Sequence, residues 1–182
     1  MPNNSQLGQV SVFFGNGKGK TTSALGTALR AVGNGFSVHL VQFMKKGASS
    51  LEEQIPGEIK SLSKFESFSF KRFGVGSWFK KGKNEEEHKA SVHETFNYLR
   101  FCLGKYDIII ADEILYAVQL GLLEEDKVVG LIKTKPKNQE LILTGSHIAL
   151  PDIFALADLV TEVKKIKHPY DKGILARKRT EF

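Results

Sequence analysis

The stretch that decides the fold is Val10-Ser11-Val12-Phe13-Phe14-Gly15-Asn16-Gly17-Lys18-Gly19-Lys20-Thr21-Thr22. Its first five residues form a short, mostly apolar run rich in β-formers, which predicts a strand. A loop rich in glycine and lysine follows, and apolar residues at helical spacing then continue from Thr21 to Val32. In such a strand–loop–helix unit, the amides of the loop and the N-terminus of the helix converge on an anion. The stretch therefore predicts a phosphate-binding loop.

This loop predicts an ATP site. Lys20 is expected to reach the triphosphate as a point charge, and the Thr21 hydroxyl is expected to ligate Mg²⁺. The strict pattern G-x-x-x-x-G-K-[ST] is not met, because Phe14 stands where the first glycine belongs. The alternative is a glycine-rich turn with solvated lysines, which the three glycines and the strand–loop–helix context disfavour. The predicted ATP-binding residues are Gly15, Asn16, Gly17, Lys18, Gly19, Lys20, Thr21 and Thr22.

A second half of the site is predicted where a buried strand ends in two acids. The run Ile108-Ile109-Ile110-Ala111 leads into Asp112 and Glu113. Asp112 is expected to orient the hydrated metal through Thr21, and Glu113 either ligates Mg²⁺ or activates a water. The predicted catalytic set is thus Lys20, Thr21, Asp112 and Glu113, with the last three as Mg²⁺ ligands or orienters. Because no Asn-Lys-x-Asp element is present, ATP is favoured over GTP.

The rest of the chain alternates strands with helices. Further strands are predicted over 37–43, 65–73, 106–111, 140–144 and 159–163, and helices over 84–103, 114–120, 124–134 and 151–157. The segment 45–59 is predicted to be a loop, and Asn84 is expected to cap its helix. The first helix is expected to bury Ala24, Leu25, Ala28, Leu29 and Val32. This alternation predicts one α/β domain over 1–182, of the three-layer P-loop NTPase (RecA-like) type, with a mostly parallel sheet and helices on both faces.

Composition narrows the class of protein. The 182 residues include 26 Lys+Arg and 20 Asp+Glu, so the formal charge of +6 favours an anionic partner. The single cysteine, Cys102, excludes an intrachain disulfide framework. No apolar run reaches about 18 residues, and residues 1–6 show no signal-peptide pattern, so we expect a soluble cytoplasmic protein. The basic runs at 164–167 and 177–179 lack interleaved aromatic residues, which favours a solvated face over a nucleic-acid patch.

Several spaced stretches together resemble the P-loop ATP:corrinoid adenosyltransferases, the cob(I)alamin adenosyltransferase family. The resemblance covers most of the chain and includes the displaced first glycine of the loop. Its matching stretches are 15–22, Gly26–Ala31 with Gly33 and Gly35, Val41–Lys45, Asp112-Glu113 with Tyr116, Thr144-Gly145, Ala157–Glu162 and Lys167–Ile174. Inside the last stretch, His168 becomes a candidate substrate or structural contact.

The resemblance implies an unusual use of a P-loop. Such enzymes transfer the 5′-deoxyadenosyl group of ATP to the cobalt of a reduced corrinoid and release triphosphate. Cobalt(I) is then the nucleophile, which agrees with the absence of a nucleophile–base pair in the motifs described above. The implied substrates are ATP and a corrinoid such as cobalamin, with Mg²⁺ as cofactor. The implied partners are an electron-donating reductase and a second subunit in a homodimer, with neither nucleic acid nor membrane.

The resemblance also implies that aromatic rings face the corrin. Phe73 and Trp78 are the candidates, although ordinary core packing is an equal alternative for Phe73. The chain departs from the family where Ser146 replaces an arginine after Thr144-Gly145, and Lys45 or Lys46 are candidates to supply that charge. It also departs in its last residues, 179–182, and in having only seven residues before Gly8.

An alternative from another class stays open on the residues alone. A RecA-like P-loop ATPase, acting as a nucleic-acid-binding motor or switch, has the same loop and the same acids. It predicts orthophosphate release stimulated by nucleic acid and weakened steeply by salt.

Overall fold

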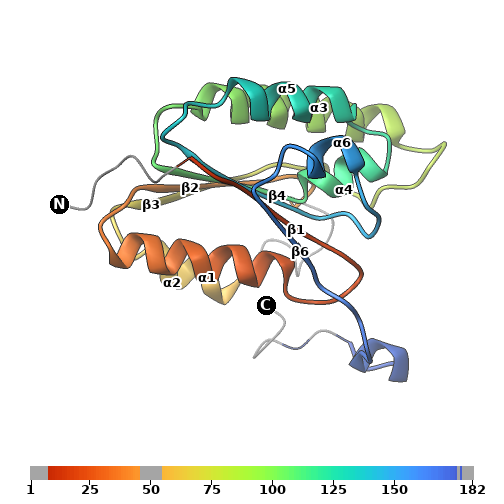
Figure 1. Cartoon of the computed structure of the whole chain (residues 1–182). Helices are drawn as coiled ribbons and strands as arrows, with labels where there is room; N and C mark the ends of the chain where they lie inside the picture. Colours follow the sequence, from red (N-terminus) through yellow and green to blue (C-terminus); the bar gives the residue numbers. More distant parts are fainter. Residues whose placement is uncertain (1–7, 46–54, 176, 178–182) are drawn as a thin grey trace.

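One parallel sheet organises the molecule, as seen in a computed structural model that describes residues 8–45, 55–175 and 177. In this part of the chain the sheet has six strands in the order β3-β2-β4-β5-β1-β6, and every pair is parallel (Figure 1). The strands are β1 (Val10–Phe14), β2 (Val38–Gln42), β3 (Phe68–Arg72), β4 (Ile108–Asp112), β5 (Glu140–Thr144) and β6 (Leu159–Glu162).

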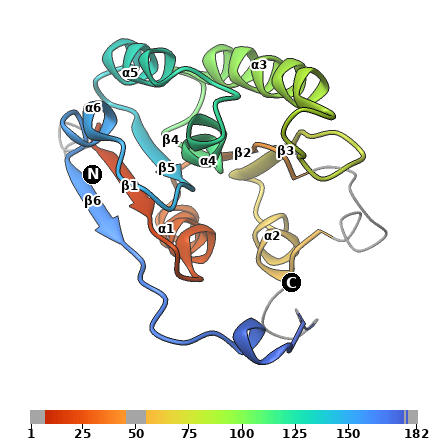
Figure 2. The same ribbon diagram turned by 90° about the vertical axis from the view of Figure 1, so that its right-hand side faces the viewer.

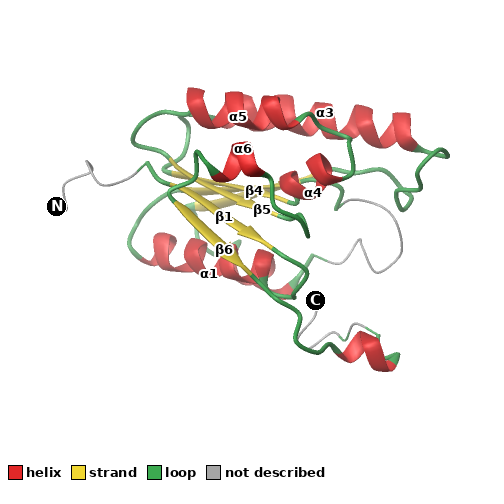
Figure 3. Cartoon of the chain, turned by 45° about the vertical axis from the view of Figure 1, so that its right-hand side comes forward, coloured by secondary structure: helices red, strands yellow, loops and turns green. Residues whose placement is uncertain are grey.

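Helices cover both faces of the sheet. Helices α1 (Lys20–Gly33) and α2 (Gly57–Leu62) lie on one face. The other face carries α3 (Glu85–Cys102), α4 (Ile114–Gln119), α5 (Glu125–Thr134) and α6 (Pro151–Phe154) (Figures 1 and 3). Beyond β6 the chain runs away from the sheet to a short 3₁₀ helix, η2 (Pro169–Lys172) (Figure 2). The predicted three-layer α/β fold with a parallel sheet is confirmed. No helix in the described ranges is long and apolar enough to cross a membrane.

The two faces have separate hydrophobic cores, because alternate side chains of each strand point to opposite faces. In β4, Ile109 and Ala111 pack under α3–α5, whereas Ile108 and Ile110 pack against α1 and α2. Strands buried on both sides explain the nearly unbroken apolar runs of the sequence. All strands are parallel, so their carboxyl ends meet at one edge, where Gln42 is registered against Asp112 and Phe13 against Thr144.

Two sequence predictions about the helices were wrong. Helix α2 begins at Gly57, inside the segment predicted as a loop, and it buries Ile59 and Leu62. A helix of six residues contains too few turns to show a periodic pattern. Leu29 is 53% exposed, and Ala31 is buried in its place. At about 100° per residue, Leu29 points roughly 100° away from the middle of the buried stripe of α1.

Candidate functional site

The glycine-rich loop joins β1 to α1 and is held in place by neighbouring segments. The amide of Gly15 donates to the carbonyl of Ser146 at 2.9 Å, and that of Gly17 donates to the carbonyl of Val163 at 2.7 Å. A Cβ at Gly15 or Gly17 would lie only 2.5 or 2.7 Å from the same Val163 oxygen. These glycines are therefore required because the exit of β6 passes directly against the loop.

Lys20 folds back over its own loop. Its ammonium donates to the carbonyls of Gly15 at 2.6 Å and Gly17 at 3.0 Å. Burial lowers the pKa of Lys20 from its ordinary value, the carboxylate of Glu113 opposes this shift, and the charge of Lys45 adds to it. The ammonium thus lies in the loop where a phosphate is expected to bind, and phosphate oxygens can replace the carbonyls as its acceptors.

Asp112, predicted from the sequence to orient a metal ion through Thr21, joins the loop to the sheet. Its Oδ1 accepts hydrogen bonds from the hydroxyls of Thr21 at 2.7 Å and Thr144 at 2.6 Å, and its Oδ2 accepts one from Gln42 Nε2 at 2.9 Å. The residue is fully buried. Because the Thr21 hydrogen is directed at Asp112, the lone pairs of Thr21 Oγ1 are left for a cation.

Glu113 pairs with a lysine from another strand. It is the N-cap residue of α4, with a left-handed backbone (φ 65°) and its amide donating to Thr144 Oγ1 at 3.0 Å. Lys45 Nζ lies 2.9 Å from Glu113 Oε1. Burial alone would lower the pKa of Lys45, but the carboxylates of Glu113 and Asp112 outweigh it and hold that pKa above its ordinary value.

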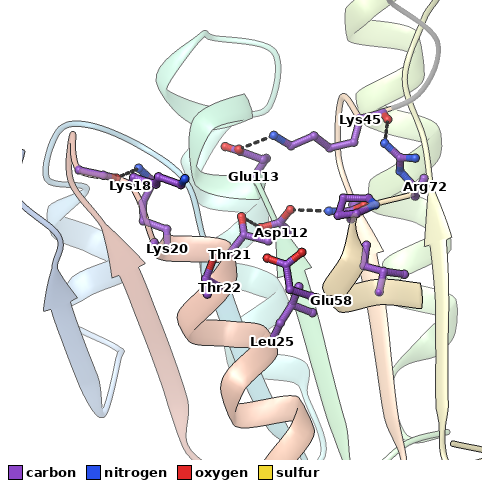
Figure 4. Close-up of a pocket in the computed structure, with 15 residues that line it drawn as sticks. Lys18, Lys20, Thr21, Thr22, Leu25, Lys45, Glu58, Arg72, Asp112 and Glu113 are labelled. Atoms are coloured by element: carbon purple, nitrogen blue, oxygen red, sulfur yellow. Dashed lines mark hydrogen bonds and ion pairs between the residues drawn. The ribbon is translucent and has the colours of Figure 1, made fainter. Parts of the chain in front are cut away.

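These groups surround one cavity of about 260 Å³ at the carboxyl edge of the sheet (Figure 4). In the part of the chain that the structure describes, four cationic side chains line it, with Lys18 and Lys20 on the loop side and Lys45 and Arg72 on the β2–β3 side. The remaining lining residues are Gly17, Gly19, Thr21, Thr22, Leu25, Gln42, Pro56, Glu58, Ile59, Asp112 and Glu113. Four cations facing three carboxylates suit a polyanion accompanied by a metal ion.

Not every predicted loop residue lines the cavity. Gly15 does not, and neither does Asn16, whose Oδ1 accepts from the amide of Lys165 at 2.9 Å. Conversely, the sequence prediction missed Gln42, Thr144 and Arg72 as site residues. All three stand at the carboxyl ends of strands. A position at the end of a strand could have marked them as candidates. To tell which strand ends lie next to the phosphate loop, however, the order of the strands in the sheet must be known.

The residues for Mg²⁺ fit the ion by their chemistry. Thr21 Oγ1 and the carboxylate of Glu113 are oxygen donors of the kind that Mg²⁺ accepts, and the ion commonly takes only one or two protein carboxylates alongside phosphate oxygens. Within the described ranges, no cluster of three or more His, Cys, Asp or Glu side chains could hold a metal by itself.

A second cavity, of about 170 Å³, adjoins the first and contains Trp78. Trp78 is 69% exposed, and the other lining residues are Phe43, Met44, Lys45, Val75, Ser77, Phe79, His88, Glu113, Tyr116 and Leu120. Phe73 is placed differently. It is 7% exposed and packs in the core beside Tyr98, with ring centroids 5.3 Å apart. The structure therefore presents Trp78, and not Phe73, to this cavity.

Asn84 holds the loop between β3 and α3, residues 73–84, which we call the Trp78 loop, and its side chain does not cap α3. It occupies the N-cap position of α3, but its side chain makes no cap hydrogen bond. It accepts from the amide of Lys80 at 2.8 Å and donates to Ser77 Oγ and to the carbonyl of Trp78 at 2.8 and 2.9 Å. The predicted cap was therefore wrong, because the side chain bonds to the residues that precede the helix.

Three further candidates have structural contacts. Ser146 is fully buried with φ 51°, its hydroxyl donates to the carbonyl of Ile148, and it lines neither cavity. His168 caps η2 by accepting from the amide of Tyr170 at 3.1 Å. In the basic run, Lys165 pairs with Asp171 at 2.9 Å. Lys46, residues 1–7 and residues 178–182 lie outside the described residues.

Comparison with known proteins gives a consistent result over nearly the whole chain. The sequence model of the family described as ATP:corrinoid adenosyltransferase BtuR/CobO/CobP matches residues 6–182. The corrinoid adenosyltransferase of Escherichia coli K12 is 35% identical over 175 residues, covering 94% of this chain and 84% of the relative. The corrinoid adenosyltransferase CobA of Salmonella typhimurium is 33% identical, and the match covers 97% of this chain and 87% of the relative. The corrinoid adenosyltransferase of Pseudomonas aeruginosa is 34% identical, with 97% of this chain and 85% of the relative covered.

Proposed function

The chain belongs to the ATP:corrinoid adenosyltransferase family, and from this premise we propose that its two adjoining cavities hold the two substrates. Family membership makes it an enzyme that adenosylates a corrinoid with ATP, which is favoured over a nucleic-acid-dependent ATPase. The single observation that carries the proposal is that a phosphate cavity with four cations adjoins a cavity lined by an exposed tryptophan.

The triphosphate of ATP lies in the glycine-rich loop. Loop amides and the N-terminus of α1 bind its oxygens, and Lys20 exchanges its carbonyl contacts with Gly15 and Gly17 for phosphate oxygens. This arrangement neutralises the group that leaves, since the reaction breaks a carbon–oxygen bond and not a phosphoanhydride bond. The protein's task is to place C5′ in line with cobalt and to stabilise the departing charge.

Thr21 and Glu113 are the residues that would hold Mg²⁺, with Asp112 orienting the first of them. The ion supplies charge neutralisation of the triphosphate when bound. Asp112 keeps the Thr21 hydroxyl turned toward the cavity through the 2.7 Å hydrogen bond, and Thr144 and Gln42 fix Asp112 in turn. Glu113 Oε1 is engaged by Lys45, which leaves Oε2 for the ion.

The corrinoid lies against the Trp78 loop. At about 170 Å³ the cavity is smaller than the roughly 300–1,000 Å³ of a drug-sized ligand pocket, so it accommodates only an edge of a corrinoid. The exposed indole offers an aromatic face for the macrocycle. Phe73 has no part in this proposal, because its ring is buried in the core. A second subunit of a homodimer is our candidate for covering the rest of the substrate.

Cobalt(I) requires an electron source, so we also propose a reductase partner and a reducing, cytoplasmic setting. The test of the proposed function is an anaerobic assay in which the corrinoid is chemically reduced before Mg-ATP is added. We expect the cob(I)alamin absorbance to be replaced by that of an alkylcobalamin, at a rate that rises to saturation with ATP. A stable cob(I)alamin spectrum in the presence of ATP would reject the proposal.

A further inference from the structure

Two residues line both cavities, and they face one another. Among the described residues, only Lys45 and Glu113 are common to the phosphate cavity and the Trp78 cavity. Figure 4 shows the Lys45 side chain reaching from the β2–β3 side toward Glu113, on the opposite side of the cavity from the loop that carries Lys20. Their 2.9 Å ion pair therefore stands at the boundary between the two proposed substrates.

The backbones that present this pair are held on all sides. The amide of Lys45 donates to the carbonyl of Phe73 at 2.7 Å, and the carbonyl of Lys45 accepts from Arg72 Nη2 at 2.5 Å. Glu113 is fixed through its amide on Thr144. Only three non-glycine residues of the described chain have positive φ, and two of them are Glu113 itself and Met44, the residue that precedes Lys45. Backbone conformations of this kind are costly, and they concentrate where a site must be held in place.

The chemistry of the transfer determines where negative charge builds up in the transition state. Cobalt(I) donates an electron pair to C5′ and becomes cobalt(III), while the C5′–O bond breaks and its electron pair stays on the triphosphate oxygen. No further oxidant or reductant is consumed in this step. Carbon must lie between cobalt and the leaving oxygen, so the new negative charge appears at the boundary between the corrinoid and the triphosphate.

We propose that Lys45 is a catalytic residue whose ammonium binds the leaving oxygen on the α-phosphate of ATP. This inference rests on the proposed function of the two cavities. Lys20, on the loop side, serves the distal phosphates, whereas Lys45 serves the phosphate nearest cobalt. The Lys45 side chain is 40% exposed and the Glu113 side chain 20%, so the ammonium can be reached by an incoming phosphate while it stays paired with Glu113.

The proposal is tested with Lys45→Met and Lys45→Arg, using Lys133→Met as the matched control. Lys133 is an exposed lysine of α5 that lines neither cavity. Single-turnover adenosylation is followed with pre-reduced cob(I)alamin at saturating Mg-ATP, and ATP affinity is measured by calorimetry without corrinoid. We expect Lys45→Met to slow bond formation by about 10²–10³-fold, as for loss of one donor to a developing oxyanion, with little change in ATP affinity. Lys45→Arg should recover most of the rate, and Lys133→Met should match the wild type.

Two results would overturn the assignment. One is a Lys45→Met rate within a few fold of wild type, and the other is a slow rate that higher ATP or corrinoid concentrations restore, which would make Lys45 a binding residue only. If Lys45→Met does not fold, as judged by its thermal transition, Lys45→Gln preserves a polar contact with Glu113 and is measured in its place. A wild-type enzyme that forms no cobalt–carbon bond would instead reject the proposed function.

Discussion

The buried carboxylate of Asp112 accepts three hydrogen bonds, from Thr21, Thr144 and Gln42. The side-chain amide of Gln42 has a further feature, an oxygen without a hydrogen-bond partner in the described part of the chain. Gln42 Oε1 is buried and has no hydrogen-bond partner among the described residues, while Gln42 Nε2 donates to Asp112 Oδ2. A rotation of the Gln42 amide would therefore let it accept a hydrogen bond from an asparagine at position 112. An Asp112→Asn substitution can thus remove the negative charge of the side chain while keeping its hydrogen bonds.

We expect Asp112→Asn to lose activity with little loss of stability. The amide keeps an oxygen for Thr21 and Thr144, and its nitrogen can donate to a rotated Gln42. Asp112→Ala leaves these donors unpaired and should cost about 1–3 kcal/mol. Urea unfolding of both variants and their adenosylation rates are the measurements. An Asp112→Asn variant as unstable as Asp112→Ala would show that the carboxylate charge itself holds the site together.

At the scale of elements, the packing of the β6 exit against the loop determines which glycines can be replaced. Gly17→Ala would place a Cβ 2.7 Å from the carbonyl of Val163, so the loop or the segment after β6 must shift. Gly26 lies on the exposed side of α1 with no atom within 4 Å of the Cβ position. We expect Gly26→Ala to raise stability by roughly 0.5–1 kcal/mol and Gly17→Ala to lower both stability and ATP affinity. Chemical denaturation and ATP titration check both, and unchanged ATP affinity in Gly17→Ala would contradict the role of this contact.

The Trp78 loop yields a second prediction at this scale. Since Trp78 is exposed and lines only the second cavity, Trp78→Ala should leave ATP affinity and folding unchanged. It should lower conversion of cobalt(II) corrinoid supplied with a reductase, and Trp78→Phe should recover part of the loss. Full activity of Trp78→Ala in that assay would remove the indole from the corrinoid site.

The sequence predicted those parts of the site that lie within one stretch of chain. The loop 15–22 and the acids Asp112 and Glu113 carry local signals, so their positions at strand ends could be predicted. The contacts of Asp112 with Gln42 and Thr144 could not, because they require β4 to lie between β2 and β5, and periodicity does not give strand order. Leu29 was wrongly expected to be buried, and Phe73, for which core packing and a place in the site were equal alternatives, proved to lie in the core. The burial of an apolar side chain near the end of an element depends on which elements pack against it, and the sequence does not show this.

At the scale of the whole molecule, His39 links stability to pH. It is 3% exposed on β2, with Nδ1 2.7 Å from Ser69 Oγ and Nε2 3.1 Å from the Tyr98 hydroxyl. Burial, together with the nearby charge of Lys71, lowers the pKa of His39 to about 4. The unfolded chain, with a pKa near 6.5, therefore binds the proton first as pH falls.

Stability should decline as pH falls from about 6.5 to about 4, by up to roughly 3 kcal/mol from this residue. Urea unfolding at pH 7 and pH 4.5 measures the decline. His39→Gln, which cannot take up a proton in this range, should lose less stability between the two pH values than the wild type. An equal loss in both proteins would assign the acid sensitivity to other groups.

The central claim, that a P-loop enzyme of this fold cleaves ATP at carbon, is tested most directly by the phosphorus product. Cob(I)alamin and Mg-ATP are incubated anaerobically with the enzyme, and ³¹P NMR identifies the species released. We predict inorganic triphosphate in a one-to-one ratio with adenosylated corrinoid. Orthophosphate and ADP, released without a cobalt–carbon bond, would contradict the account.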